Sequence, residues 1–299
     1  MNASATRVSA LALAILALAP AAAAARPGGL LLPPAGGAPD YQLGGAYAPD
    51  PRVEIVARDR EDPPAPGRYS ICYINGFQTQ PHEISLWPTS LILHSGGQPV
   101  GDPNWPGEYL LDTTTAAKRA GIFAIVQPWI EGCADAGFSA VEFDNLDTYT
   151  RSSGLISRAD NLAMAQLYVQ EAHRLGLAAA QKNAAEDSAL FKAQAGFDFA
   201  VSEECAVWNE CGLYTAVYGV RVIDIEYPED LAVPFQQVCL DTPDVPSMVL
   251  RDRDLTTPGQ GGYVFELCQG AGSGALFHDG FEATASRSGA AIPSRPDAG

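Results

Sequence analysis

The chain has 299 residues and a formal net charge of −17 at pH 7, from 35 acidic and 18 basic side chains. A protein this acidic repels nucleic acid and anionic membrane surfaces, so neither is expected as a partner, whereas a cationic ligand would be attracted. Taken alone, however, such acidity is also explained by solubility.

The first residues have the pattern of an export signal. Arg7 precedes an apolar run from Val8 to Leu18, and small residues follow up to Ala25. This pattern predicts a secretory signal peptide over residues 1–25, too short to remain as a membrane-spanning helix. No later stretch is long and apolar enough to span a bilayer. We therefore expect a secreted protein, extracellular or periplasmic, without membrane contact after cleavage, and we expect a monomer.

Composition separates a central domain from its two flanks. Residues 26–40 are rich in Pro and Gly and predict a flexible leader, while residues 269–299 lack periodicity and predict a disordered tail. The domain is expected over residues 41–268. Its candidate strands are, in chain order, residues 41–47, 52–58, 68–74, 140–145, 176–183, 197–204, 220–227 and 247–254. Residues 75–113 show no clean strand and predict an elaborated loop.

Helical patterns separate the later strands. Ser157 is a candidate N-cap with Asp160 three residues on, an apolar face follows, and Gly176 ends the pattern. Residues 186–196 repeat this pattern on a smaller scale. Strands that alternate with helices predict a (β/α)₈ barrel, in the α/β class. An open doubly wound sheet is the alternative, but it usually carries a glycine-rich phosphate loop after its first strand, and none is visible.

Six cysteines in an exported chain predict disulfides. The nearby pair Cys205 and Cys211 is the best candidate for a local bond, and Cys239 with Cys268 is a weaker one. The four histidines are scattered without the spacing of metal ligands, so we expect no metal site and no cofactor.

Acidic side chains gather where four of the predicted strands end. These residues are Glu142 and Asp144, Glu203 and Glu204, Asp224 and Glu226, and Asp252 and Asp254, while the fifth strand ends at Lys182 and Asn183. A barrel brings strand ends to one mouth, where unused like charges would destabilise the fold. Two carboxylates across a pocket are the catalytic groups that most glycoside hydrolases use. Alternation along the strand puts Glu142 and Asp144 on one side, with Asp144 nearer the mouth, but it does not choose between Glu203 and Glu204.

Several ordered motifs carry a family resemblance. The segments AVEFDNLDTY, EAHRLGLAAAQKN, FDFAVSEECAVWNEC and IEYPED, with WPGEYLLD upstream and VLRDRDL downstream, resemble glycoside hydrolase family 114 over residues 41–256. The resemblance implies a (β/α)₈ barrel that acts as an endo-α-1,4-polygalactosaminidase on de-N-acetylated galactosamine polymers. It implies that Asp144 and Glu203 are the catalytic pair. The sequence departs from the family motifs at Phe143, Ser202 and Glu204, none of which removes a catalytic carboxylate.

The resemblance leads to a mechanistic hypothesis. Asp144 would attack the anomeric carbon and Glu203 would act as acid and then base, with net retention; the exchanged roles stay open. Lys182 is expected to hold one acid ionised, with a structural ion pair as the alternative. The further candidates for substrate contact are Glu142, Asp147, Tyr149, Trp105, Trp208, Glu226, Tyr227 and Asp252. Two alternatives remain: a non-catalytic carbohydrate-binding barrel, or an α-glycosidase acting on N-acetylated galactosaminoglycan.

Overall fold

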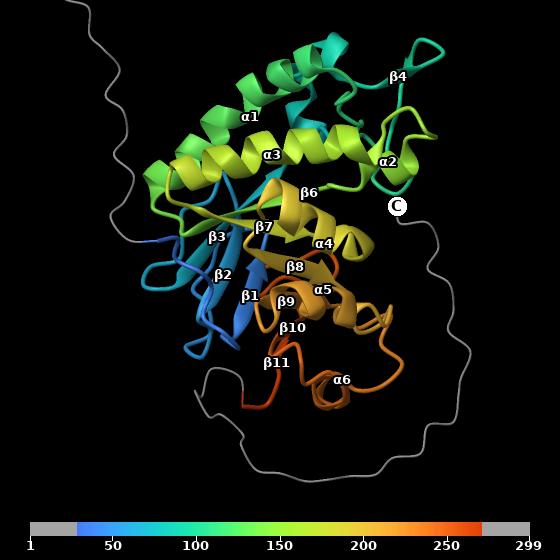
Figure 1. Ribbon diagram of the computed structural model, residues 1–299. Coiled ribbons are helices and arrows are strands. Elements are labelled where there is room, and N and C mark those ends of the chain that lie inside the picture. The colour runs from blue at the N-terminus through green and yellow to red at the C-terminus, as the bar shows by residue number, and fades with distance from the viewer. Residues whose placement is uncertain (1–28, 271–299) are drawn as a thin grey trace, which may run out of the picture.

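Eight parallel strands follow one another around a barrel in the computed structural model, which describes residues 29–270 (Figure 1). They are β1 (Pro39–Gln42), β2 (Ile55–Asp59), β3 (Tyr69–Asn75), β6 (Ala140–Asp144), β7 (Ala178–Lys182), β8 (Phe199–Glu203), β9 (Val222–Glu226) and β10 (Ser247–Arg251). A ninth strand, β11 (Phe265–Leu267), lies antiparallel beside β10. The predicted barrel fold is confirmed, and each of the eight expected strands is present. Strand β1 begins two residues inside the segment expected to be a leader.

The barrel closes between β1 and β10 through a side chain. No backbone ladder joins these two strands within residues 29–270, although they lie side by side. Instead the guanidinium of Arg251, which is fully buried, donates to the carbonyl of Tyr41 and pairs with Asp40 at 3.1 Å. Nearby, a Cβ on Gly44 would lie 2.3 Å from the carbonyl oxygen of Leu255, so only glycine allows this approach.

Helices cover the later strand connections. They are α1 (Ala116–Ala136), α2 (Thr148–Arg151), α3 (Arg158–Arg174), α4 (Ser188–Leu190) with the π-helical turn η4 (Phe191–Ala195), α5 (Cys211–Tyr218) and α6 (Phe235–Asp241). In Figure 1, α1 and α3 lie side by side along the outside of the sheet. The β1–β2 and β2–β3 connections contain no helix. Because the second spans only residues 60–68 and holds three prolines, it is too short for a packed helix.

Helices α3 and α1 differ in how clearly the sequence predicts them. At α3, Ser157 and Asp160 form the expected capping box, and Gly176 follows in a left-handed conformation. Helix α1 was not expected from the sequence, because Pro128 and two glycines interrupt its helical pattern. Its N-cap is Thr115, whose side chain accepts from the amide of Lys118, and one face of the helix packs into the core.

The long segment between β3 and α1 is the expected elaborated loop. It contains two short 3₁₀ turns, η1 (Pro81–Leu86) and η2 (Thr89–Leu91), and the small hairpin of β4 (His94–Ser95) and β5 (Gln98–Pro99). Backbone hydrogen bonds tie its two halves together, from Thr79 to Tyr109 and from Leu111 to Phe77. The segment is therefore held together by its own backbone hydrogen bonds and lies over one side of the barrel mouth.

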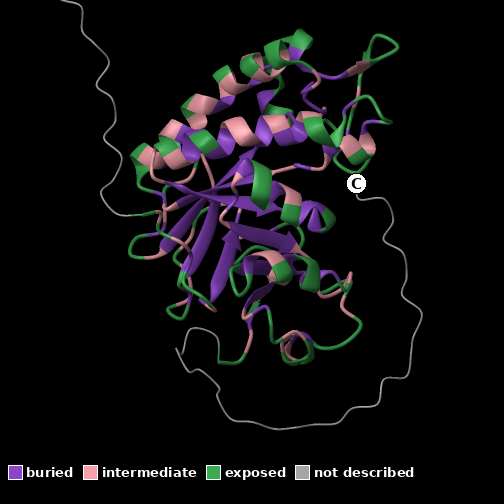
Figure 2. Cartoon of the chain, viewed as in Figure 1, coloured by how far each residue is buried: buried purple, intermediate pink, exposed green. Residues whose placement is uncertain are grey.

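Buried apolar residues form one cluster inside the barrel and another between sheet and helices. Tyr41, Ile55, Phe199 and Val249 belong to the inner cluster, and the outer one includes Tyr168. Figure 2 shows buried strands at the centre and exposed outer faces on the helices. Between residues 29 and 270, no helix combines the length and apolar character needed to cross a membrane.

Three disulfides link elements of the fold. Cys205 is bonded to Cys211 and Cys239 to Cys268, which are the two pairs that the sequence suggested, and Cys72 is bonded to Cys133. The predicted signal peptide and most of the predicted tail lie outside the described residues.

Candidate active site

A pocket of about 340 Å³ opens at the carboxyl ends of the parallel strands. Five of its lining residues are the final residues of their strands: Asp59, Asn75, Asp144, Lys182 and Glu203. The barrel thus presents charged and polar groups at one mouth, as expected from its topology.

Asp144 ends β6 with both carboxylate oxygens held. Tyr73, on the neighbouring strand β3, donates its hydroxyl at 2.8 Å, and the amide of Asn145 donates at 2.7 Å. Asn145 has a left-handed backbone, with φ of 65°, which Asn tolerates better than most residues. The turn therefore aims a fixed carboxylate into the pocket.

Glu203 ends β8 with a richer set of donors. Asn183 donates its side-chain amide at 3.0 Å, Tyr227 donates its hydroxyl, and the ammonium of Lys182 lies 3.5 Å away. Burial raises the pKa of Glu203, but the Lys182 charge and the hydrogen bonds outweigh it and place that pKa below its usual value. These partners therefore favour the ionised form of Glu203 in the unliganded site.

Lys182 is a buried cation at the floor of the pocket. Its ammonium donates to the hydroxyl of Tyr41 at 2.7 Å and lies 3.1 Å from Glu142, which accepts from that hydroxyl at 2.6 Å. Burial disfavours the ammonium, yet Asp144, Glu203 and Glu142 together hold the pKa of Lys182 well above its usual value. The lysine therefore stays charged beside the two carboxylates.

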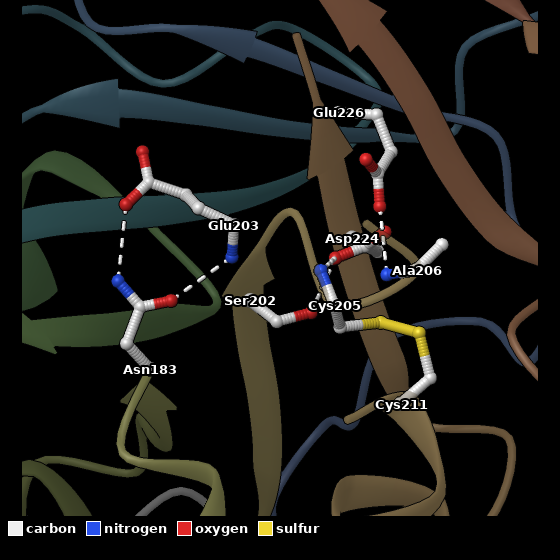
Figure 3. The surroundings of a disulfide bond; sticks show 8 residues. All are labelled: Asn183, Ser202, Glu203, Cys205, Ala206, Cys211, Asp224 and Glu226. Carbon is white, nitrogen blue, oxygen red and sulfur yellow. Dashed lines mark hydrogen bonds between the residues drawn. A yellow bond between two sulfur atoms is a disulfide. The ribbon is translucent and has the colours of Figure 1, made fainter. Parts of the chain in front are cut away.

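A second carboxyl pair holds the turn that follows Glu203 (Figure 3). Asp224 accepts from the amide of Cys205 at 3.1 Å, and Glu226 accepts from the amide of Ala206 at 2.9 Å. Burial, together with the like charge of the neighbour, raises the pKa of Glu226 far above its usual range, and burial also raises that of Asp224. This pair anchors the backbone of the turn and does not line the pocket.

The structure brings five of the predicted site residues into contact with the pocket besides Asp144 and Glu203. Of these, Lys182, Tyr227, Trp208 and Asp147 lie near the strand ends, and Trp105 reaches in from the long loop with 55 % of its surface exposed. Asp147 is paired with Arg151 at 2.8 Å, so its charge is already compensated.

Four predicted substrate contacts lie away from the pocket lining. Glu142 is fully buried below it and forms an ion pair with Lys182, while Glu226 accepts a hydrogen bond from a backbone amide. Asp252 accepts from the amides of Thr256 and Val264, and Tyr149 donates its hydroxyl to Asp187. The sequence did not show this placement, because strand-end position does not fix the direction of a side chain or its local partners.

Other lining residues were not among the predicted substrate contacts. They are Tyr41, Asp59, Tyr73, Asn75, Glu108, Asn145, Arg151, Asn183, Glu204 and Arg253, with Leu43, Gln80 and Leu255 at the rim. The strand-end rule had placed Asn183 and Glu204 at the mouth, and applied to β2 and β3 it would also have found Asp59 and Asn75. Glu108 lies in the motif WPGEYLLD, but its place in the pocket depends on the fold of the long loop.

A parallel barrel with two held carboxylates in one pocket defines the class of carboxylate-dependent glycoside hydrolases. The cysteines in the described part of the chain are all disulfide-bonded, which leaves no thiol nucleophile there. Residues 19–273 match the model of glycoside-hydrolase family GH114, so the chain belongs to this family and is a glycoside hydrolase.

Solved structures of the same fold agree with this assignment. The chain is similar to Aspergillus fumigatus Ega3, solved in complex with galactosamine, with a TM-score of 0.65 and 22 % identity over 81 % of this chain and 98 % of that one. It is also similar to the glycoside hydrolase domain of PelA from Pseudomonas aeruginosa, with a TM-score of 0.52 and 14 % identity over 75 % of this chain and 97 % of that one. No curated protein sequence matches the chain.

Proposed function

We propose that this protein is a secreted endo-α-1,4-polygalactosaminidase that cleaves de-N-acetylated galactosamine polymers. The observation that carries the proposal is the pair Asp144 and Glu203, which end β6 and β8 and line one pocket in a GH114 chain. The galactosamine bound to the similar protein Ega3 supports the choice of sugar. The acidic chain suits a polymer that carries ammonium groups, because opposite charge steers association.

The proposed reaction is a double displacement. A carboxylate oxygen of Asp144 bonds to the anomeric carbon, the glycosidic C–O bond breaks, and the leaving oxygen takes a proton from Glu203. Glu203 then takes a proton from water, the water oxygen bonds to the anomeric carbon, and Asp144 is released. Two inversions give net retention of configuration.

The charge state of Glu203 gives this mechanism a pH consequence. The acid must carry a proton, whereas Lys182 and the donors around Glu203 hold its pKa below the usual range. The free enzyme therefore holds less of the active form as the pH rises above that pKa. We expect kcat/KM to be highest at acidic pH and to fall on the alkaline side.

The direct test compares wild type with Asp144→Asn and Glu203→Gln on de-N-acetylated α-1,4-galactosamine oligomers. We expect Glu203→Gln to lower kcat by about 10²–10⁴-fold and Asp144→Asn to lower it at least as far. Product length is read by mass spectrometry and the configuration of the new reducing end by NMR immediately after cleavage. The matched control is Glu54→Gln, an exposed carboxylate before β2, which should behave as wild type.

Other outcomes of this experiment would indicate a different substrate, a non-catalytic role or a different mechanism. Cleavage of the N-acetylated polymer alone would assign the enzyme to that substrate instead. Binding without turnover by folded wild type would indicate a carbohydrate-binding barrel. Initial release of the inverted anomer would contradict the double displacement. Export is tested separately, by N-terminal sequencing of the secreted protein, which we expect to begin after residue 25; the three disulfides are typical of exported proteins.

A further inference from the structure

The carboxylates that line the pocket differ in whether a cation compensates them. There are six in the described structure, and three belong to ion pairs: Asp147 with Arg151, Glu203 with Lys182, and Glu204 with Arg253. The other three are Asp59, Glu108 and Asp144, and no basic side chain of residues 29–270 lies within ion-pairing distance of them. The pocket therefore holds concentrated but unevenly compensated negative charge.

The three carboxylates outside ion pairs share one side of the mouth. Asp59 ends β2 and Asp144 ends β6, and β3 lies between these strands. Glu108 joins them through Asn75, the last residue of β3, whose side-chain amide donates to it at 3.3 Å. The cations that line the pocket are Lys182 at the end of the adjacent strand β7, Arg151 in α2 and Arg253 after β10, and each forms one of the ion pairs described above.

Of the carboxylates on this side of the mouth, Glu108 is the one whose side chain is held least by the fold. It follows a turn in which its amide donates to the carbonyl of Trp105, and its own carbonyl accepts from the amide of Asp102. Its carboxylate receives only the long hydrogen bond from Asn75 among the described side chains. A half-buried carboxylate with spare acceptor capacity, beside the proposed nucleophile, fits an ammonium group of the ligand.

We propose that Glu108 selects for the free amine of the substrate, by pairing with the ammonium of the galactosamine unit bound against Asp144. This inference rests on the proposed function and adds the residue that distinguishes the de-N-acetylated polymer from the N-acetylated one. An acetamido group has no positive charge, so it gains only a neutral-donor hydrogen bond there. Glu108 is a specificity residue in this proposal and takes no part in bond cleavage.

The titration of Glu108 supports this role. Burial and the charges of Asp144 and Asp102 raise the pKa of Glu108 to about 7, while the hydrogen bond from Asn75 and the charge of Arg151 oppose the shift. Near neutral pH the carboxyl is partly protonated, and an arriving ammonium favours its ionised form. Binding of the cationic polymer should therefore tighten as the pH rises toward about 7.

The experiment compares two matched oligomers of equal length, fully de-N-acetylated and fully N-acetylated. Wild type, Glu108→Gln, Glu108→Asp and the surface control Glu54→Gln are assayed on both, with KM followed from about pH 5 to 8. We expect Glu108→Gln to raise KM for the de-N-acetylated oligomer by about 30-fold with little change in kcat, and to leave the N-acetylated oligomer unaffected. Glu108→Asp should retain part of the preference, because it keeps the charge on a shorter side chain.

The pH dependence of KM separates pairing with the substrate amine from a merely structural role of Glu108. In wild type, KM for the de-N-acetylated oligomer should fall as Glu108 ionises, and this fall should be absent in Glu108→Gln. Titration of the substrate amines affects wild type and the variant equally. Unchanged preference and unchanged pH dependence in a folded Glu108→Gln variant would overturn the inference while the proposed function stands. Equal loss of kcat on both oligomers would also overturn it, by placing Glu108 in the cleavage step. If wild type cleaves neither oligomer, both proposals fail.

Discussion

Lys182 acts on both proposed catalytic carboxylates, Asp144 and Glu203, through a single buried charge. Its ammonium lies 3.5 Å from Glu203 and 3.1 Å from Glu142, and its charge also acts on Asp144. Burial raises the pKa of Glu142, whereas the Lys182 charge and the hydrogen bond from Tyr41 oppose that shift.

Replacing the lysine should show which limb of the pH profile belongs to Glu203. In Lys182→Met the pKa of Glu203 should rise, because burial raises it and the Lys182 charge is the largest opposing influence. If Glu203 is the catalytic acid, the alkaline limb of kcat/KM moves to higher pH. The measurement is a kcat/KM profile on de-N-acetylated oligomers. Lys192→Met, which removes an exposed lysine, is the matched control and should leave both limbs in place.

A shift confined to the acidic limb would exchange the roles of the two carboxylates. Glu203 would then have to act in its ionised form, as nucleophile, and Asp144 as acid. A profile unchanged by Lys182→Met would contradict the electrostatic role of the lysine altogether.

The residues of the site were predictable to the extent that strand alternation and topology decide position. Alternation placed Asp144 above Glu142 on one side of β6, and the structure has that order, with Glu142 below the pocket. Alternation does not reveal partners that arrive from distant strands, such as Tyr41 of β1 on Glu142. For the same reason, alternation could not show that Glu226 accepts a hydrogen bond from a backbone amide and does not face the pocket.

Disulfides tie three different parts of the barrel together at the level of elements. Cys72–Cys133 fixes α1 on β3, and Cys239–Cys268 fixes α6 on the chain just after β11. Cys205–Cys211 instead closes the turn between Glu203 and α5 (Figure 3). Two of the bonds thus hold the scaffold together, and the third lies next to the proposed catalytic residue Glu203.

Removing each disulfide by a pair of Ala substitutions should separate these roles. The chain-entropy relation, applied to sequence separations of 61, 29 and 6, gives losses of about 4, 3.5 and 2 kcal/mol in the free energy of unfolding. Activity should follow the opposite order, with kcat reduced most in the Cys205/Cys211 variant because the turn after Glu203 is released. Urea unfolding and kcat at one temperature provide both measurements. Full activity in that folded variant would contradict the positional role of the bond.

The element pattern was predictable where helices and strands carry their own signals. The capping box of Ser157 and the apolar strands needed no tertiary information. Helix α1 was hidden because Pro128 and its glycines weaken the local signal, and contacts with β3 and α3 compensate in the folded protein. The antiparallel strand β11 was missed for a related reason: three residues pair only because β10 offers a free edge.

Folding of the whole molecule is expected to take up protons, because several acids are buried where their neutral form is favoured. Burial raises the pKa of Glu226 and Asp224 behind the active-site turn, and raises those of Glu108 and Glu204 in the pocket to about 7. The acids whose pKa is lowered in the fold, including Glu203, have lost their protons in both the folded and the unfolded state once the pH is well above about 4.5. In that range, only the acids with a raised pKa make the free energy of unfolding depend on pH.

These shifts predict that the protein becomes less stable toward alkaline pH. A raised carboxyl pKa gives stability that is complete below the unfolded pKa and is lost as the pH rises toward the folded one. Each such proton contributes a slope of about −1.4 kcal/mol per pH unit to the free energy of unfolding, reduced for half-exposed groups such as Glu204. Urea unfolding at about pH 5.5, 7 and 8.5 should show this decline, and Glu226→Gln should flatten it by removing one titrating group from the buried pair. A wild-type stability that rises with pH, or an equally steep decline in Glu226→Gln, would mean that the pair is ionised in the folded protein.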